Sequence, residues 1–361
     1  MPMQRTHTLQ ATLVAVIWGL NFVAIDYGLD AFPPLLFAAL RFTLVAVPAV
    51  FLVPRPQVPA RIIVGVGMLV CVGQFGFLFT AMHMGMPAGL SSIVLQCQAM
   101  FTVLFAMAYL GERPARGRLV ALGIAAAGLA VIAVGRGHSA GAGSFLLLLA
   151  AGASWGLGNV VTRKAGSQAG FGLVVWSGLV APLPLFALSL GFEGWAADRD
   201  AITGMGLSGV LALGYIVVVS TFVGYGLWNN LLGRFPASSV APYSLLVPVV
   251  GIAAAAVVLG ERPTGWDWGG GALVMAGIAG VSGLLGARPD RVRRKRAATA
   301  DPSVRPGYAD GRDPGRVPGA PAPSTAPSST TAATAAPTTA TATAPPTTAS
   351  SSPPATTATT A

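Results

Sequence analysis

One charged side chain, Arg41, lies well inside a long apolar stretch of this sequence. If that stretch is a membrane helix rising 1.5 Å per residue, Arg41 lies about 12 Å below the outer surface, near mid-bilayer. A charge there costs roughly 2.5 to 3.5 kcal/mol on insertion scales, so it needs a partner or water. Two interpretations stay open. The guanidinium reaches up to Asp26 or a water layer, or it faces a water-filled cavity and attracts the carboxylate of a substrate.

Three amide side chains share the depth of Arg41. The same helical count puts Asn21, Gln74 and Gln96 about 12 to 14 Å below the outer surface. Polar groups in hydrocarbon tend to turn toward a bundle interior or a cavity, so a common layer favours a polar pocket. Hydrogen bonding between helices is the alternative for any single amide. Gln98 is two residues beyond Gln96, on a roughly opposite helix face, and is expected outside that pocket.

The second half of the chain has a comparable polar and aromatic set, expected nearer the cytoplasmic side. Trp18 and Trp155 fall close to mid-depth and are expected to flank the centre as a pair. Trp228 lies near the end of its stretch, so an interfacial anchor and a pocket-facing role stay equal alternatives for it. The predicted substrate-binding residues are Arg41, Asn21, Gln74, Gln96, Trp18, Trp155, Asn159, Tyr225, Trp228, Tyr243 and Ser244.

Enzyme chemistry is not indicated by any motif. Residues 152–156 match the Gly-x-Ser-x-Gly pattern of serine hydrolases, but that pattern needs a strand-to-helix elbow and a histidine base. The histidines, His7, His83 and His138, all lie near predicted membrane edges. The sequence has no phosphate-binding loop and no Cys/His cluster with metal spacing. We therefore expect no catalytic residue, no metal and no cofactor.

Composition indicates an integral membrane protein. Only 9% of residues are charged and 53% are hydrophobic, and the mean hydropathy is +0.68. The apolar stretches are continuous rather than alternating, so helices are expected throughout the membrane. About 20 residues are needed for one crossing. Ten stretches are long enough, at approximately 9–29, 33–53, 60–82, 87–110, 117–135, 144–163, 171–191, 203–226, 236–259 and 266–286.

An internal repeat divides these stretches into two sets of five. The pentapeptide Leu-Gly-Glu-Arg-Pro occurs at 110–114 and at 259–263, an offset of 149 (259 minus 110). The same offset aligns Pro87-Ala88 with Pro236-Ala237. Five crossings per half is an odd number, so the second half must enter the membrane inverted. The predicted fold is all-α, with a first five-helix repeat at 1–139, a second at 140–288, and a disordered Pro/Thr/Ala/Ser-rich tail at 289–361.

Basic residues set the predicted orientation. With a cytoplasmic N-terminus, one side carries nine Lys and Arg in its loops and the other carries three, which is a positive-inside bias. Both termini are then cytoplasmic and the membrane is the plasma (inner) membrane. Most of the net charge of +10 is topological, so the lipid bilayer is the expected partner and nucleic acid is not. The nine are Arg5, Arg55, Arg61, Arg113, Arg116, Arg118, Arg163, Lys164 and Arg234, and the three are Arg136, Arg199 and Arg262.

Small residues predict one close helix contact. Ala276, Gly280 and Ala279, Gly283 in the tenth stretch, with Ala126 and Ala130 in the fifth, let two backbones approach closely. That face is either packing within the bundle or a dimer seam, so a homodimer stays one alternative.

The repeat, the ten stretches and the paired Gly-Glu-Arg-Pro turns resemble the EamA family of the drug/metabolite transporter superfamily. The likeness is strongest to its exporters of cysteine-pathway metabolites, in residues 16–23, 40–42, 85–90, 94–99, 223–226, 231–234, 240–242 and 244–251. Asp26 and the long tail depart from that pattern. The resemblance implies export of O-acetylserine, cysteine or related small zwitterions by alternating access. A permease of other specificity or uptake direction, and a membrane scaffold acting through its tail, are the alternatives.

Overall fold

The computed structural model describes residues 5–136, 142–166, 170–235 and 237–282, and within them every regular element is helical. The predicted tail at 289–361 lies outside the described residues, as does His138. Long apolar runs without alternation leave helices as the way to satisfy backbone groups in lipid. Seven helices of the described chain are long and apolar enough to cross a membrane, which makes this a multi-pass membrane protein.

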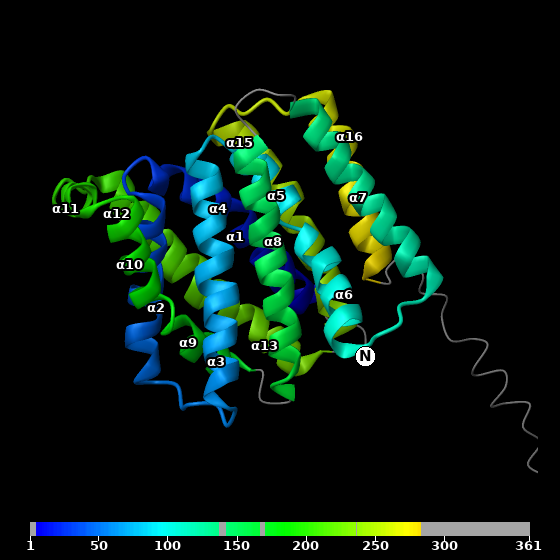
Figure 1. The fold of residues 1–361 in the computed structure, drawn as a ribbon, viewed down its shortest axis with the longest axis horizontal. Helices are drawn as coiled ribbons and strands as arrows, with labels where there is room; N and C mark the ends of the chain where they lie inside the picture. Colours follow the sequence, from blue (N-terminus) through cyan, green and yellow to red (C-terminus); the bar gives the residue numbers. More distant parts are fainter. Residues whose placement is uncertain (1–4, 137–141, 167–169, 236, 283–361) are drawn as a thin grey trace, which may run out of the picture. The chain divides into compact units, whose positions relative to one another are not determined.

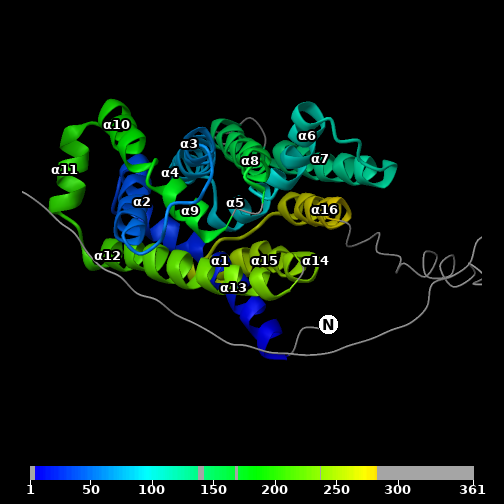
Figure 2. The ribbon, with the colours of Figure 1, turned by 90° about the horizontal axis from the view of Figure 1, so that it is seen from below.

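Each of the ten predicted stretches overlaps helix in the structure (Figures 1 and 2). Three of the corresponding helices, however, are shorter than 18 residues, so ten crossings stay a prediction. In chain order the helices of the first half are α1 Arg5–Leu29, α2 Pro34–Val50, α3 Ala60–Val66, η1 Gly67–Gly73, α4 Gln74–His83, α5 Ala88–Val94, α6 Cys97–Leu110 and α7 Arg116–Arg136.

Two features of the second half were not expected. The helix predicted to end at 226 continues to Arg234, so Trp228 lies inside it rather than near its end. A short helix, α11 Trp195–Thr203, fills a loop. The helices of this half are α8 Ala142–Arg163, α9 Phe171–Gly178, α10 Pro182–Phe192, α11, α12 Leu207–Gly214, η3 Tyr215–Tyr225, α13 Gly226–Arg234, α14 Ala237–Val240, η4 Ala241–Leu245, α15 Leu246–Val258 and α16 Gly265–Val281.

The two halves share departures from ideal helix at equivalent places. The π-helix η1, at 67–73, maps by the repeat offset of 149 onto 216–222, inside the π-helix η3. The chain breaks between α5 and α6 at 95–96, which maps onto 244–245 in the 3₁₀ segment η4. Wide or broken turns leave backbone groups for other partners, and such turns are frequent at functional sites.

The helices α7 and α16 lie side by side (Figures 1 and 2). Their contact uses small residues, because a Cβ on Gly128 would come within 2.6 Å of the Gly270 carbonyl oxygen, and one on Gly277 within 2.5 Å of the Ala125 nitrogen. The predicted small-residue face is a different one, since Ala126, Ala130 and Ala276 are exposed. Gly283 lies outside the described residues.

A row of phenylalanines runs through the core of the first half. Phe32 stacks on Phe37, which contacts Phe79, and Phe79 contacts Phe75, with ring centroids 5.2 to 5.8 Å apart. Tilted and edge-to-face pairs of this kind stabilise beyond their buried area. The row ends against Arg41, whose guanidinium carbon lies 4.1 Å from the centre of the Phe75 ring.

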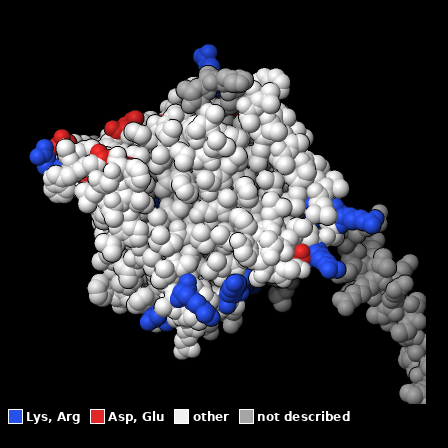
Figure 3. Space-filling view, viewed as in Figure 1, with Lys and Arg blue, Asp and Glu red and all other residues white. Residues whose placement is uncertain are grey.

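Surface charge lies mainly toward the ends of the bundle (Figure 3). Figure 3 shows a broad belt of surface without Lys, Arg, Asp or Glu, with basic side chains gathered mainly toward the lower end of that view. That end holds the start of α3 and the end of α8 (Figure 1), with Arg61 and Arg163. We refer to the end that carries Arg61, Arg163 and Arg234 as the arginine-rich end.

Candidate functional site

A cavity of about 420 Å³ lies among the helices and is lined from both halves. It takes residues from α1, α2, α3, η1, α4, α5, the α5–α6 break, α6, α8, α9, η3, α13, η4 and α15. Toward the arginine-rich end its lining reaches Thr162 and Gly170. Of the eleven predicted residues, the structure brings ten together in this lining: Trp18, Asn21, Arg41, Gln74, Gln96, Trp155, Asn159, Tyr225, Trp228 and Ser244.

Arg41 is 3% exposed and has few polar contacts. Its Nη2 donates to the Thr221 hydroxyl oxygen across a long 3.4 Å, and its guanidinium stacks over Phe75. The Nε and Nη1 groups are buried without a hydrogen-bond partner. Ion pairs in the described residues join Arg163 to Glu112 and Arg199 to Asp200, and Asp26 does not pair with Arg41. The cavity-facing interpretation of Arg41 therefore fits the geometry better.

Two amide oxygens of the same cavity lining are also unpaired. The Asn21 Oδ1 and the Gln74 Oε1 atoms are buried and accept no hydrogen bond, and both side chains are less than 10% exposed. Buried polar groups are nearly always paired, so an unpaired set needs an explanation such as a ligand or water. Here the set combines cationic donors with neutral acceptors in the lining of one cavity.

The π-helix η3 supplies the hydroxyl group that contacts Arg41. The Thr221 hydroxyl donates to the Ile216 carbonyl oxygen five residues earlier, at 2.8 Å, which leaves its oxygen to accept from Arg41. An i to i−5 spacing is that of a π turn, so the wide helix and the hydroxyl are geometrically linked. Thr221 was not predicted. The available signal was a polar pair, Ser220-Thr221, in the middle of an apolar stretch.

The aromatic residues form a group around Trp18. Its indole nitrogen donates to the Ser220 carbonyl oxygen at 3.2 Å, and its ring lies 5.1 Å from Tyr225 and 5.2 Å from Trp228. Trp228 thus faces the cavity, and the interfacial-anchor alternative does not fit its place. Trp155 lines the cavity but is not part of this group, so the two mid-depth tryptophans are not in direct ring contact.

Asn159 belongs to a second polar cluster, in which its side-chain N–H donors have acceptors. Its side-chain nitrogen donates to Gln98 Oε1 at 2.9 Å and to Thr102 Oγ1 at 3.1 Å, which joins α8 to α6. Gln98 also lines the cavity, so its expected exclusion was wrong. That expectation assumed a straight helix through residue 96, whereas the chain breaks at 95–96 and α6 starts afresh at Cys97.

Tyr243 lies apart from the cavity lining. It packs against the cluster of Ala11, Leu231 and Val240. Its neighbour Ser244 lines the cavity. Both residues belong to η4, and at three residues per turn adjacent side chains diverge by about 120°.

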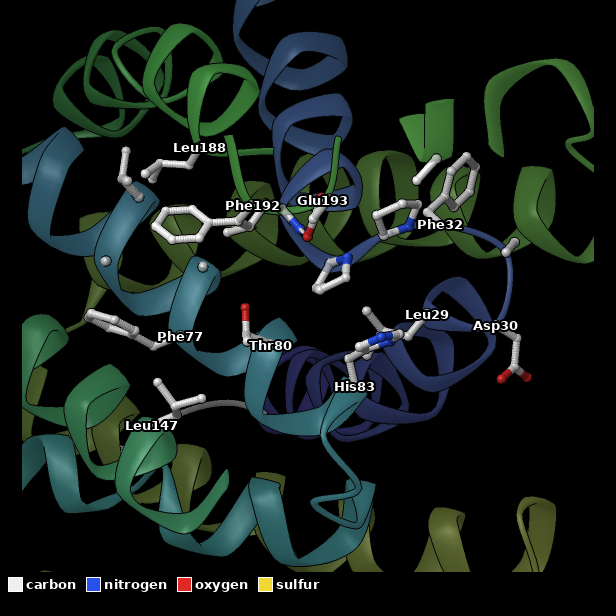
Figure 4. A pocket seen from close by; sticks show the side chains of 18 residues that line it. Leu29, Asp30, Phe32, Phe77, Thr80, His83, Leu147, Leu188, Phe192 and Glu193 are labelled. Atoms are coloured by element: carbon white, nitrogen blue, oxygen red, sulfur yellow. Dashed lines mark hydrogen bonds between the residues drawn. The ribbon is translucent and has the colours of Figure 1, made fainter. Parts of the chain in front are cut away.

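A larger pocket, of about 860 Å³, lies elsewhere (Figure 4). Leu188, Phe192 and Glu193 line one side of it, with Phe77, Thr80 and His83 of α4 opposite. Its lining includes two acids, Asp30 and Glu193, and the Glu193 carboxylate accepts from the backbone nitrogens of Leu35 and Leu36 at 2.7 and 3.1 Å. This carboxylate caps α2 and is not free for a ligand.

Known proteins share this chain's pattern over both halves. The EamA-like transporter family model matches residues 7–134 and 143–283. A probable amino-acid metabolite efflux pump of Escherichia coli (strain K12) is 44% identical over 76% of this chain and 94% of its own. The pump of the same description from Salmonella typhimurium is 45% identical over the same shares. A probable terminal-alkyne amino-acid exporter of Streptantibioticus cattleyicolor is 29% identical over 80% of this chain and 95% of its own.

The fold has a counterpart among solved structures. One crystal structure superposes with a TM-score of 0.55 at 20% identity, over 79% of this chain and 98% of the other. At that identity the likeness concerns the fold.

Proposed function

Because this chain belongs to the EamA-like transporter family, we propose that it exports small zwitterionic amino-acid metabolites from the cytoplasm, with O-acetylserine and cysteine as the model substrates. The names of the efflux pumps and of the amino-acid exporter support this direction and this class of substrate.

One observation carries the proposal. The lining of one cavity holds a buried Arg41 with two unpartnered donor groups, and it also holds the unpartnered oxygens of Asn21 and Gln74. A guanidinium suits a carboxylate, and neutral amide oxygens suit an ammonium group, so the two ends of a zwitterion are matched without a net charge change. The volume of about 420 Å³ is within the usual range for small-molecule sites.

The repeat supplies the proposed transport movement. We place ten crossings as two inverted five-helix repeats in the plasma membrane, with both termini cytoplasmic. The paired π-helices and the paired helix breaks support this arrangement, since they recur at equivalent positions of the two halves. Broken helices at a midplane site between inverted repeats are typical of alternating-access transporters. The arginine-rich end would then face the cytoplasm.

The test is efflux from proteoliposomes loaded with labelled O-acetylserine or cysteine, with empty liposomes as the baseline. We expect saturable efflux that unlabelled cysteine inhibits. Two analogues separate the ends of the substrate: cysteamine lacks the carboxylate and 3-mercaptopropionate lacks the amine. Both should inhibit at least about tenfold less well than cysteine, the loss expected when a charged group is left unpaired.

The same preparation tests the alternatives. Preferred transport of a cationic dye over cysteine would indicate a permease of other specificity. A chain ending at residue 288 should transport as the full chain does; loss of transport on truncation would favour the scaffold alternative.

A further inference from the structure

The repeated pentapeptide builds the same backbone turn twice. Gly111 and Gly260 adopt left-handed φ angles of 66° and 67° at the ends of α6 and α15. In each copy the following glutamate nitrogen donates back six residues, Glu112 to Ala106 at 3.3 Å and Glu261 to Ala255 at 3.2 Å. This is the glycine-ended helix cap in which L side chains are disfavoured. The turn holds each glutamate side chain just beyond a helix end.

The two glutamates differ in what their carboxylates bind. Glu261 accepts from the backbone nitrogens of Ala88 and Gly89, at 2.6 and 3.0 Å, and so joins the end of α15 in the second half to the start of α5 in the first. The absence of a side chain at Gly89 leaves room for the Glu261 carboxylate, because a Cβ there would lie 3.0 Å from Glu261 Oε2. Glu112 instead binds Arg163 at 2.9 Å, and both side chains are about half exposed.

The repeat predicts an equivalent contact for Glu112 at the other end of the bundle. The offset of 149 maps Ala88 onto Ala237, the first residue of α14, just as it maps Glu261 onto Glu112. In inverted repeats, a contact made by one copy at one end has its counterpart at the other end. The equivalent contact would therefore join Glu112 to the Ala237 nitrogen, in place of the exposed pair with Arg163.

The cavity is asymmetric in the same sense as the glutamates. Its lining extends to Thr162 and Gly170, at the arginine-rich end where Glu112 pairs with Arg163. On α5 its lining begins at Ser92, one turn inside the seated Glu261. The end where Glu261 binds the first amides of α5 is thus the closed end, and the end where Glu112 pairs with Arg163 is the one toward which the cavity extends.

We propose that Glu261 and Glu112 are alternating latches, each closing its own end of the cavity by seating on the first amides of a helix of the other half. This rests on the alternating access proposed above. A carboxylate on unpaired amides at a helix start is a charge-assisted contact. Breaking the Glu261 contact and forming the Glu112 contact exchanges one carboxylate–amide contact for another, so the two end states stay close in free energy. The exposed Arg163 pair is weak and gives way readily.

Distances between spin labels test the latch without a transport assay. In a chain with Cys71 and Cys97 changed to alanine, Met84→Cys with Gly265→Cys reports the closed end. Gly117→Cys with Gly233→Cys reports the arginine-rich end. Met84 is exposed, and a Cβ at each of the three glycines meets open space. The measurement uses the full chain in lipid nanodiscs, with and without cysteine.

Glu261→Gln should open the closed end. The ratio of longer to shorter Met84–Gly265 label distances should rise about tenfold, and the Gly117–Gly233 distances should shift shorter at the same time. Glu112→Gln should have no such effect at the closed end. Glu193→Gln is the matched control, because Glu193 also caps a helix across the halves but stands outside the repeated motif.

Unchanged distance distributions in Glu261→Gln would overturn the latch, as would an equal opening in Glu193→Gln. If Glu261→Gln does not insert into the membrane, the label distances are measured in Glu261→Asp instead, since aspartate keeps the charge but is too short to bind both amides. A chain that moves no amino acid yet shows the reciprocal shift would overturn the proposed function and keep the latch. Efflux of amino acid without any shift in the label distances would overturn the latch and keep the proposed function.

Discussion

Two polar clusters line the same cavity and differ in whether their hydrogen bonds are complete. Around Arg41, two donor groups and the oxygens of Asn21 and Gln74 are buried without partners. Around Asn159, the side-chain nitrogen makes two good hydrogen bonds to α6. A buried polar group left unpaired carries the full desolvation penalty, whereas a paired one is close to neutral. The first cluster therefore fits the proposed substrate site, and the second fits a contact that holds two helices together.

The same difference distinguishes two side chains of one residue type. Asn21 and Asn159 are both asparagines on long helices, and both line the cavity. Only the contacts of their amide groups distinguish them. The predictions below change each cluster in turn and ask whether transport or stability responds.

Arg41→Ala should have the largest effect. Among the described residues that line the cavity, Arg41 is the one with a cationic side chain, so without it saturable efflux of cysteine should fall to the level of empty liposomes. Arg41→Lys keeps the charge but loses the planar fork, and we expect about tenfold weaker inhibition by cysteine. Yield and thermal unfolding in detergent serve as the folding control. Efflux unchanged in Arg41→Ala would place the carboxylate elsewhere.

Gln74→Leu should have the next largest effect. Leucine is of similar size, so packing beside Phe75 is kept while the unpartnered oxygen is removed. The apparent affinity for cysteine should fall about threefold to tenfold, because one acceptor for the ammonium is lost. The affinity for 3-mercaptopropionate, which has no ammonium, should not change. Equal losses for both compounds would mean that Gln74 does not face the amine.

Much of this site could be predicted from depth alone. Arg41, Asn21, Gln74 and Gln96 were grouped because polar residues at one level of several helices tend to face one cavity. That argument needs only the rise of a helix. It works for α1 and α2, which have no break between their first residue and Asn21 or Arg41.

Contacts that depend on irregular helix could not be predicted in this way. Gln98 was expected outside the pocket because the break at 95–96 has no clear sequence signal, and its side-chain direction depends on that break. The same holds for Thr221, whose hydroxyl is oriented by a π turn. Tyr243 and Ser244 were predicted together, although the 3₁₀ turn sends them to different places.

Thr221→Val tests positioning rather than binding. Valine keeps the shape but removes the hydroxyl that accepts from Arg41 and donates to Ile216. The contact with Arg41 is long, so we expect a moderate loss of about threefold in the affinity for cysteine. Thr221→Ser retains the hydroxyl and should restore most of it. A loss in Thr221→Ser as large as that in Thr221→Val would point to packing of the methyl group instead of the hydrogen bond.

Asn159→Leu should have the smallest effect on transport, and its effect should be on stability. Hydrogen bonds between membrane helices average about 0.6 kcal/mol, so the change and Gln98→Leu should each lower stability slightly. Because the two side chains bond to each other, the double variant should be less destabilised than the sum of the single ones, by a coupling of that size. Steric trapping or denaturant unfolding measures the cycle. If Asn159→Leu instead lowers cysteine affinity as Gln74→Leu does, the second cluster also binds substrate, and complete hydrogen bonding does not mark a structural role in this cavity.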